Sequence, residues 1–156
     1  MGQDRGTSLE EHRKGDLIVF TTFDLMEITL RILCGLVTAI CLLGGLNLLN
    51  KGAHAFLPEA ARPQPVLDNL MRFLSGIYFG MGFMMAWITY NMQEYTVLPY
   101  FIGLVVIFSG LGRLYSKRKV GSAGKYFDNI MIVEIVLGVA IVLVNYFRLS
   151  QNEIAP

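Results

Sequence analysis

The sequence predicts an all-α, polytopic membrane protein, in which a polar and then interfacial N-terminal segment precedes an antiparallel bundle of four transmembrane helices. Hydrophobic residues make up 54% of the 156 residues, charged residues only 16%, and the mean hydropathy is +0.52. Soluble domains carry about 25% charged residues. Three uncharged runs, 32–50, 73–93 and 95–112, are joined by a fourth, 129–147, which only Glu134 interrupts. Each run approaches the ~20 residues that an α-helix needs to cross ~30 Å of hydrocarbon.

The N-terminal segment, residues 1–29, is polar to about residue 15. It continues as "DLIVFTTFDLMEITLRIL", in which apolar and charged residues alternate without a clear period. That mixture predicts an interfacial segment leading into the first helix. The bundle itself is one domain, residues 30–148, and residues 149–156 form a short tail.

The four helices are predicted at about 30–50, 66–92, 97–116 and 126–147. A loop with three of the five prolines, "KGAHAFLPEAARPQP", separates the first two helices. The connection "MQEYT" is short enough to make the second and third helices a tight antiparallel hairpin. A basic, glycine-containing loop, "KRKVGSAGK", precedes the fourth helix. Because the chain crosses the membrane four times, both termini are expected on the same side.

Three ionisable residues stand inside the predicted helices, each at a similar depth from the same end of the bundle: Arg72, Arg113 and Glu134. A charge in the hydrocarbon costs ~2.5–3.5 kcal/mol on insertion scales, so each needs a partner or a route to water. The short side chain of Glu134 cannot reach the headgroups, and Arg113 on the preceding antiparallel helix is its natural partner. Such a pair fixes helix register or also lines a ligand cavity. Asn47 and Asn69 complete the candidate binding set.

Simpler interpretations stand beside this one. Arg72 follows Asp68 by four residues and so forms a local i,i+4 pair, and Arg113 snorkels toward the headgroups. If Asp68 is not counted, two arginines face one carboxylate, and the surplus positive charge suits an anion such as a lipid phosphate. Asp68 cancels that surplus if it pairs with Arg72.

Gly76 and Gly80 form a small-xxx-small step on the second helix, and Gly112 and Gly138 are further helix-packing candidates. The step allows a close helix crossing, either within the bundle or between protomers. Cys34 and Cys41 are interpreted as packing residues, and no Cys/His spacing predicts a metal site or a cofactor. The net charge of +1 gives no indication of a nucleic-acid partner.

The segments "NLMRFLSGIYFGMG", "FSGLGRLYS" and "IVEIVLGV" resemble the small, four-helix DoxX-like membrane proteins of unknown function. The resemblance covers about residues 30–148. Its most specific positions are Arg72 with Gly76, Gly112 with Arg113, and Glu134. It implies a multi-pass protein of the bacterial inner (cytoplasmic) membrane, and it supplies no activity, cofactor or catalytic residue.

These observations favour a small, non-catalytic inner-membrane protein, accessory to cell-envelope maintenance, which binds a lipid or another anionic amphiphile at the Arg72, Arg113 and Glu134 cluster. The alternative is a structural subunit that docks onto a larger membrane protein complex. The partners considered are the lipid bilayer, a bound lipid, another membrane protein or a homo-oligomer. A small transporter or a membrane enzyme is less favoured, because the helices show no second half of similar pattern and no nucleophile–base arrangement.

Overall fold

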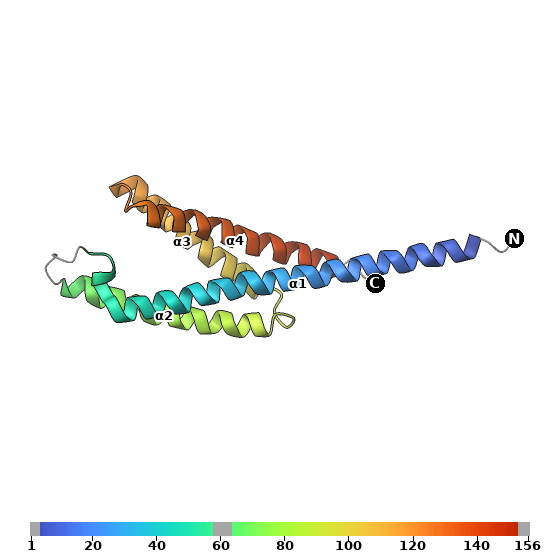
Figure 1. Ribbon diagram of the computed structural model, residues 1–156, viewed down its shortest axis with the longest axis horizontal. Helices are drawn as coiled ribbons and strands as arrows, with labels where there is room; N and C mark the ends of the chain where they lie inside the picture. Colours follow the sequence, from blue (N-terminus) through green and yellow to red (C-terminus); the bar gives the residue numbers. More distant parts are fainter. Residues whose placement is uncertain (1–3, 58–63, 153–156) are drawn as a thin grey trace. The chain divides into compact units, whose positions relative to one another are not determined.

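The computed structural model describes residues 4–57 and 64–152, and these residues are helical apart from short connections. The helices are α1 (Asp4–Lys51), the 3₁₀ turn η1 (Gly52–Ala55), α2 (Pro65–Tyr90), α3 (Leu98–Val120) and α4 (Lys125–Asn152) (Figure 1). The all-α prediction is therefore confirmed. Residues 1–3 of the predicted polar segment, 58–63 of the predicted loop and 153–156 of the predicted tail lie outside the described residues.

Four helices are long and apolar enough to cross a membrane: 24–54, 65–90, 98–120 and 125–151. Their outward faces carry large apolar side chains such as Phe108, Ile132 and Phe83, which are more than half exposed. Contiguous apolar surface of this extent is disfavoured in water. It is the ordinary surface of a helix that contacts lipid tails.

The chain divides into two compact units, one formed by residues 1–31 with 96–156 and the other by 32–95. We name them the α3–α4 unit and the α2 unit after the helices that each contains whole. Helix α1 contributes its N-terminal part to the first unit and its C-terminal part to the second.

Helix α1 differs from the predicted first helix, because it begins at Asp4 rather than near residue 30. Residues 16–30 continue the same helix, so no helix boundary lies near residue 30. The physical reason is that no proline occurs before Pro58, and strong helix formers occupy the polar stretch "LEEHRK". The interfacial position of residues 16–29 stays a prediction. At 1.5 Å per residue, 48 residues make a helix of roughly 70 Å, about twice the thickness of the hydrocarbon.

The ends of the other helices follow local chemistry. Pro65 occupies the first turn of α2 and Pro99 the first turn of α3, where a missing N–H costs nothing. Gly121 and Gly124 have φ values of 103° and 112°, so the turn between α3 and α4 uses backbone conformations that favour glycine. Lys117, Arg118 and Lys119 form the last turn of α3, where positive charge complements the helix dipole.

Helices α3 and α4 lie against each other as an antiparallel pair (Figure 1), and glycines set their separation. A Cβ added at Gly138 would lie 2.6 Å from the carbonyl oxygen of Gly103, and one added at Gly110 would lie 3.0 Å from that of Met131. The packing predicted for Gly138 is thus observed, while Gly103 and Gly110 were not predicted.

Gly76, Gly80 and Gly112 do not show the close packing that the sequence predicts. A Cβ at any of them would have no described atom within 4 Å, and all three residues are exposed. In the α2 unit the close contacts involve other glycines, because a Cβ at Gly82 would meet Leu42 and one at Gly45 would meet Ser75. The small-xxx-small spacing identified a glycine-rich face that does not pack within the described residues, and packing between protomers stays a prediction.

This packing predicts that Gly138→Ala destabilises the α3–α4 unit by roughly 1–3 kcal/mol, the usual cost of overpacking. Gly112→Ala is the matched control and should be neutral or slightly stabilising, because alanine favours the helix over glycine by up to ~1 kcal/mol. Unfolding of each variant in mixed detergent micelles measures the difference. Equal effects of the two substitutions would contradict the assigned packing.

Candidate functional site

Arg72 and Asp68 form an ion pair one turn apart on α2. Nε of Arg72 donates to Oδ2 of Asp68 at 2.8 Å, and Nη2 reaches Oδ1 at 3.5 Å. This is the local i,i+4 pair that the sequence offered as the simpler interpretation of Arg72, and it is confirmed. The carboxylate of Asp68 therefore balances the charge of Arg72, and the surplus positive charge inferred without it is wrong.

The same pair joins α2 to the end of α1. Nη1 of Arg72 donates to the carbonyl oxygen of Leu49 at 2.5 Å, and Oδ1 of Asp68 accepts the backbone N–H of Ala53 at 3.1 Å. The last carbonyls of a helix lack partners within it and carry its negative dipole end, which a guanidinium satisfies. Gly52 has a φ of 53°, and a Cβ there would collide with the carboxylate of Asp68. All three nitrogens of the Arg72 guanidinium are thus engaged in holding the α1–α2 connection.

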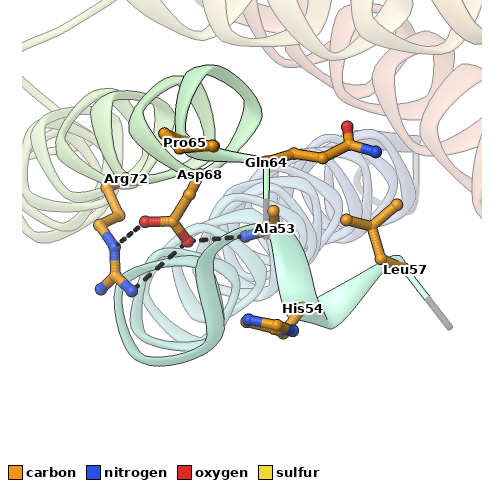
Figure 2. A pocket seen from close by; sticks show the side chains of 7 residues that line it. All are labelled: Ala53, His54, Leu57, Gln64, Pro65, Asp68 and Arg72. Atoms are coloured by element: carbon orange, nitrogen blue, oxygen red, sulfur yellow. Dashed lines mark hydrogen bonds and ion pairs between the residues drawn. The ribbon is translucent and has the colours of Figure 1, made fainter. Parts of the chain in front are cut away.

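A pocket of about 350 Å³ lies beside this connection. Figure 2 shows Asp68 and Arg72 together on one side of it, where Asp68 is bonded to Arg72 and to the N–H of Ala53. Gln64 and Leu57 lie on the other side, and His54 lies below. Because Arg72 and Asp68 already satisfy each other, the pocket has no unpaired charge from that pair to offer a ligand.

Arg113 of α3 and Glu134 of α4 form the second ion pair, with Nε of Arg113 donating to Oε2 of Glu134 at 2.8 Å. The pairing predicted from the topology is confirmed. The side chain of Glu134 is 17% exposed and that of Arg113 31%, so the pair is shielded without being fully dry. The guanidinium carbon of Arg113 also lies 5.9 Å from the centre of the Phe127 ring, within cation–π range.

Arg113 differs from Arg72 in how many of its donors are used. Only its Nε has a hydrogen-bond partner among the described residues; the two terminal NH₂ groups have none. Arg113 lines a pocket of about 100 Å³ at the turn between α3 and α4, which we name the hairpin-end pocket. Its lining comprises Arg113, Ser116, Lys117, Gly121, Ala123, Phe127, Asp128 and Met131.

A second set of polar contacts lies at the hairpin-end pocket. Oδ2 of Asp128 accepts from Nζ of Lys117 at 3.0 Å and from Oγ of Ser122 at 2.8 Å. Oγ of Ser122 in turn accepts the N–H of Gly124 at 3.1 Å. The turn therefore fixes a carboxylate and an ammonium group at the pocket that contains Arg113.

The predicted site residues fall into both units. Arg113 and Glu134 belong to the α3–α4 unit, whereas Arg72, Asn47 and Asn69 belong to the α2 unit. The structure brings Arg113 and Glu134 together, and it pairs Arg72 with Asp68 instead. Asn47 and Asn69 are exposed and form no hydrogen bond with another described residue. A single layer that joins all three charged residues stays a prediction.

Sequence analysis missed a group of buried polar residues far from the hairpin-end pocket. Asn145 is fully buried, Arg148 and Glu27 are 3% and 8% exposed, and Glu27 pairs with Arg31 at 2.8 Å. Nδ2 of Asn145 donates to the carbonyl oxygen of Thr96 at 2.9 Å. A signal existed, because Asn145 continues the helix face of Glu134 and Gly138, and Arg148 follows one turn later.

No group of His, Cys, Asp or Glu side chains within the described part of the chain could hold a metal ion. Four helices are apolar enough to span a membrane, and the charged residues Arg72, Arg113 and Glu134 within them form ion pairs. These features define a small, multi-pass helical membrane protein. Residues 29–145 match the family described as "Domain of unknown function (DUF4345)". The chain belongs to this family. No curated protein and no solved structure matches it, and the DoxX-like resemblance stays a prediction.

The Arg113–Glu134 contact predicts strong coupling between the two positions. Glu134→Gln and Arg113→Gln together should be milder than either change alone, because each single change leaves one shielded charge without its partner. A coupling energy of roughly 0.5–3 kcal/mol is expected from unfolding in mixed micelles.

The control cycle combines Glu134→Gln with Arg118→Gln, since Arg118 is exposed and contacts neither residue. In this control cycle, the losses of unfolding free energy caused by the two single substitutions should add. Additive losses in the Arg113 and Glu134 cycle as well would show that the observed pair does not stabilise the fold.

Proposed function

We propose that this protein is a small, non-catalytic membrane protein that holds a phospholipid by its phosphate at the hairpin-end pocket. Following the DoxX-like resemblance, we place it in the bacterial inner membrane, as an accessory to cell-envelope maintenance. The observation that carries the binding proposal is Arg113, which lines this pocket with both terminal NH₂ groups unused.

The chemistry of the guanidinium supports a phosphate ligand. A guanidinium offers a planar fork of donors that matches two oxygens of a phosphate. Glu134 takes Nε of Arg113 and so orients the plane, which leaves the terminal donors for the ligand. Lys117 lies at the same pocket, and Arg118 and Lys119 follow it in the last turn of α3.

The position of the pocket supports a lipid source for that phosphate. The pocket lies where α3 ends and α4 begins, at one end of two helices that are long enough to span the bilayer. Tyr115 and Tyr126 are about two-thirds exposed near this end, as is typical of aromatic residues at the headgroup level. Basic residues there attract anionic headgroups.

Arg72 is no longer part of the proposed site. Its nitrogens satisfy Asp68 and the carbonyl of Leu49, so a ligand would have to displace a contact that closes the α1–α2 connection. Arg72 therefore serves as a control for binding at Arg113.

The proposal predicts that Arg113→Lys lowers the amount of bound phospholipid by about tenfold, because lysine keeps the charge opposite Glu134 but lacks the fork of donors. Arg72→Lys should retain the lipid. Native mass spectrometry of the full-length protein, extracted with a mild detergent, measures the bound lipid. Equal lipid on both variants would overturn the proposal.

A second candidate function is a structural subunit that docks onto another membrane protein or onto a copy of itself. The observation that favours it is the open face of Gly76 and Gly80 on α2, which no described residue of the α2 unit covers. Small residues on a lipid-facing helix allow another helix to approach closely.

Docking through this face predicts that Gly80→Leu removes an associated protein mass or a second protomer from the native mass spectrum. Gly112→Leu, at an open glycine on another helix, is the matched control and should leave the assembly intact. A wild-type spectrum that contains only single protomers would contradict this candidate.

A further inference from the structure

The charges at the hairpin-end pocket are balanced rather than purely positive. Arg113 and Lys117 contribute two cations, and their ion-pair partners Glu134 and Asp128 contribute two anions. Of the two carboxylates, Asp128 lines the pocket and Glu134 does not. A ligand in the pocket therefore contacts both a cation and an anion on the protein.

Asp128 keeps one oxygen for a ligand. Its Oδ2 is taken by Lys117 and Ser122, and Oδ1 has no partner among the described residues. The side chain is 27% exposed, so Oδ1 is not sealed from a ligand. Because Ser122 is held by the N–H of Gly124, the carboxylate is anchored to the turn and preorganised as a hydrogen-bond acceptor.

The pocket thus combines unused guanidinium donors from Arg113 with an unused carboxylate oxygen from Asp128 in a space of about 100 Å³. A purely anionic headgroup would accept hydrogen bonds from Arg113 but would be repelled by the carboxylate of Asp128. A headgroup that carries a phosphate and a primary ammonium two carbons away would satisfy both. It would also match the zero net charge of the two ion pairs.

We propose that the hairpin-end pocket recognises the phosphoethanolamine headgroup of a membrane lipid, with its phosphate on Arg113 and its ammonium on Asp128. This inference rests on the proposed function and names its ligand. A choline headgroup has no N–H to donate to Oδ1 of Asp128, and a glycerol headgroup has no positive charge for it. The pocket therefore selects against both.

The test compares dioctanoyl phosphatidylethanolamine, phosphatidylglycerol and phosphatidylcholine, added at equal concentration to the delipidated full-length protein in detergent. Native mass spectrometry measures the occupancy of each lipid. The wild type should favour phosphatidylethanolamine over the other two by about tenfold, the lower end of the range for one hydrogen bond between charged groups. Asp128→Asn should lose this preference and bind relatively more phosphatidylglycerol, because it removes the acceptor charge and releases Lys117.

Asp24→Asn is the matched control, since Asp24 is an exposed carboxylate that does not line this pocket; it should keep the wild-type preference. Thermal unfolding of Asp128→Asn verifies that the variant is folded, and asparagine can still accept from Ser122. Soluble O-phosphoethanolamine should displace the lipid only at far higher concentration, because it lacks the acyl chains.

The outcomes separate the two proposals. Phosphatidylglycerol bound as tightly as phosphatidylethanolamine, with binding still lost in Arg113→Lys, would overturn the headgroup assignment and keep the phosphate site. Equal binding of phosphatidylcholine would overturn the role of Asp128 as an N–H acceptor. Displacement by O-phosphoethanolamine at the same concentration as the lipid would overturn the lipid source. If Arg113→Lys leaves the lipid occupancy unchanged, the proposed function itself is overturned.

Discussion

The contact between Arg113 and Glu134 is the constraint on which the α3–α4 unit depends. A carboxylate eight or nine residues into an apolar helix is largely shielded from water, so a cation beside it lowers the cost of placing α4 in the membrane. That pairing fixes the register of α3 against α4. In this register Gly103 faces Gly138 and Gly110 faces Met131, so the two helices approach until backbone touches backbone. The ion pair and the glycine contacts thus require the same register of α3 against α4.

Arg72 and Arg113 show how the same side chain takes different roles through its neighbours. Arg72 has a carboxylate one turn away on its own helix and a helix end within reach, so its donors are consumed by the fold. Arg113 meets its carboxylate across a helix pair, through Nε alone, and keeps the outer edge of the guanidinium. Both residues look equivalent by depth and by flanking glycines. What distinguishes them is the number of donors left over, and this number decides which arginine can serve a ligand.

The sequence predicted the four membrane-spanning helices and the Arg113–Glu134 pair, because uncharged runs and a lone buried carboxylate are strong local signals. Of the glycines that pack α3 against α4, it predicted Gly138 but not Gly103 or Gly110. Gly76 and Gly80 have the expected spacing, yet Gly103, Gly110 and Gly138 make the contacts, since packing depends on the rotation of each helix rather than on spacing alone. The start of α1 was also misplaced, because an irregular apolar pattern resembles a helix boundary when no proline or cap marks the true one. Helix α4 also continues past its predicted end at residue 147, and this further turn buries Arg148.

The uninterrupted course of α1 has a mechanical consequence. About 20 residues precede Asp24 in the same helix, which makes a helical rod of roughly 30 Å that continues into the first membrane-spanning segment. Membrane helices commonly tilt by about 20°, and a tilt of that size would swing the far end of such a rod by roughly 10 Å. A change in bilayer thickness that alters the tilt would therefore be magnified at the N-terminus.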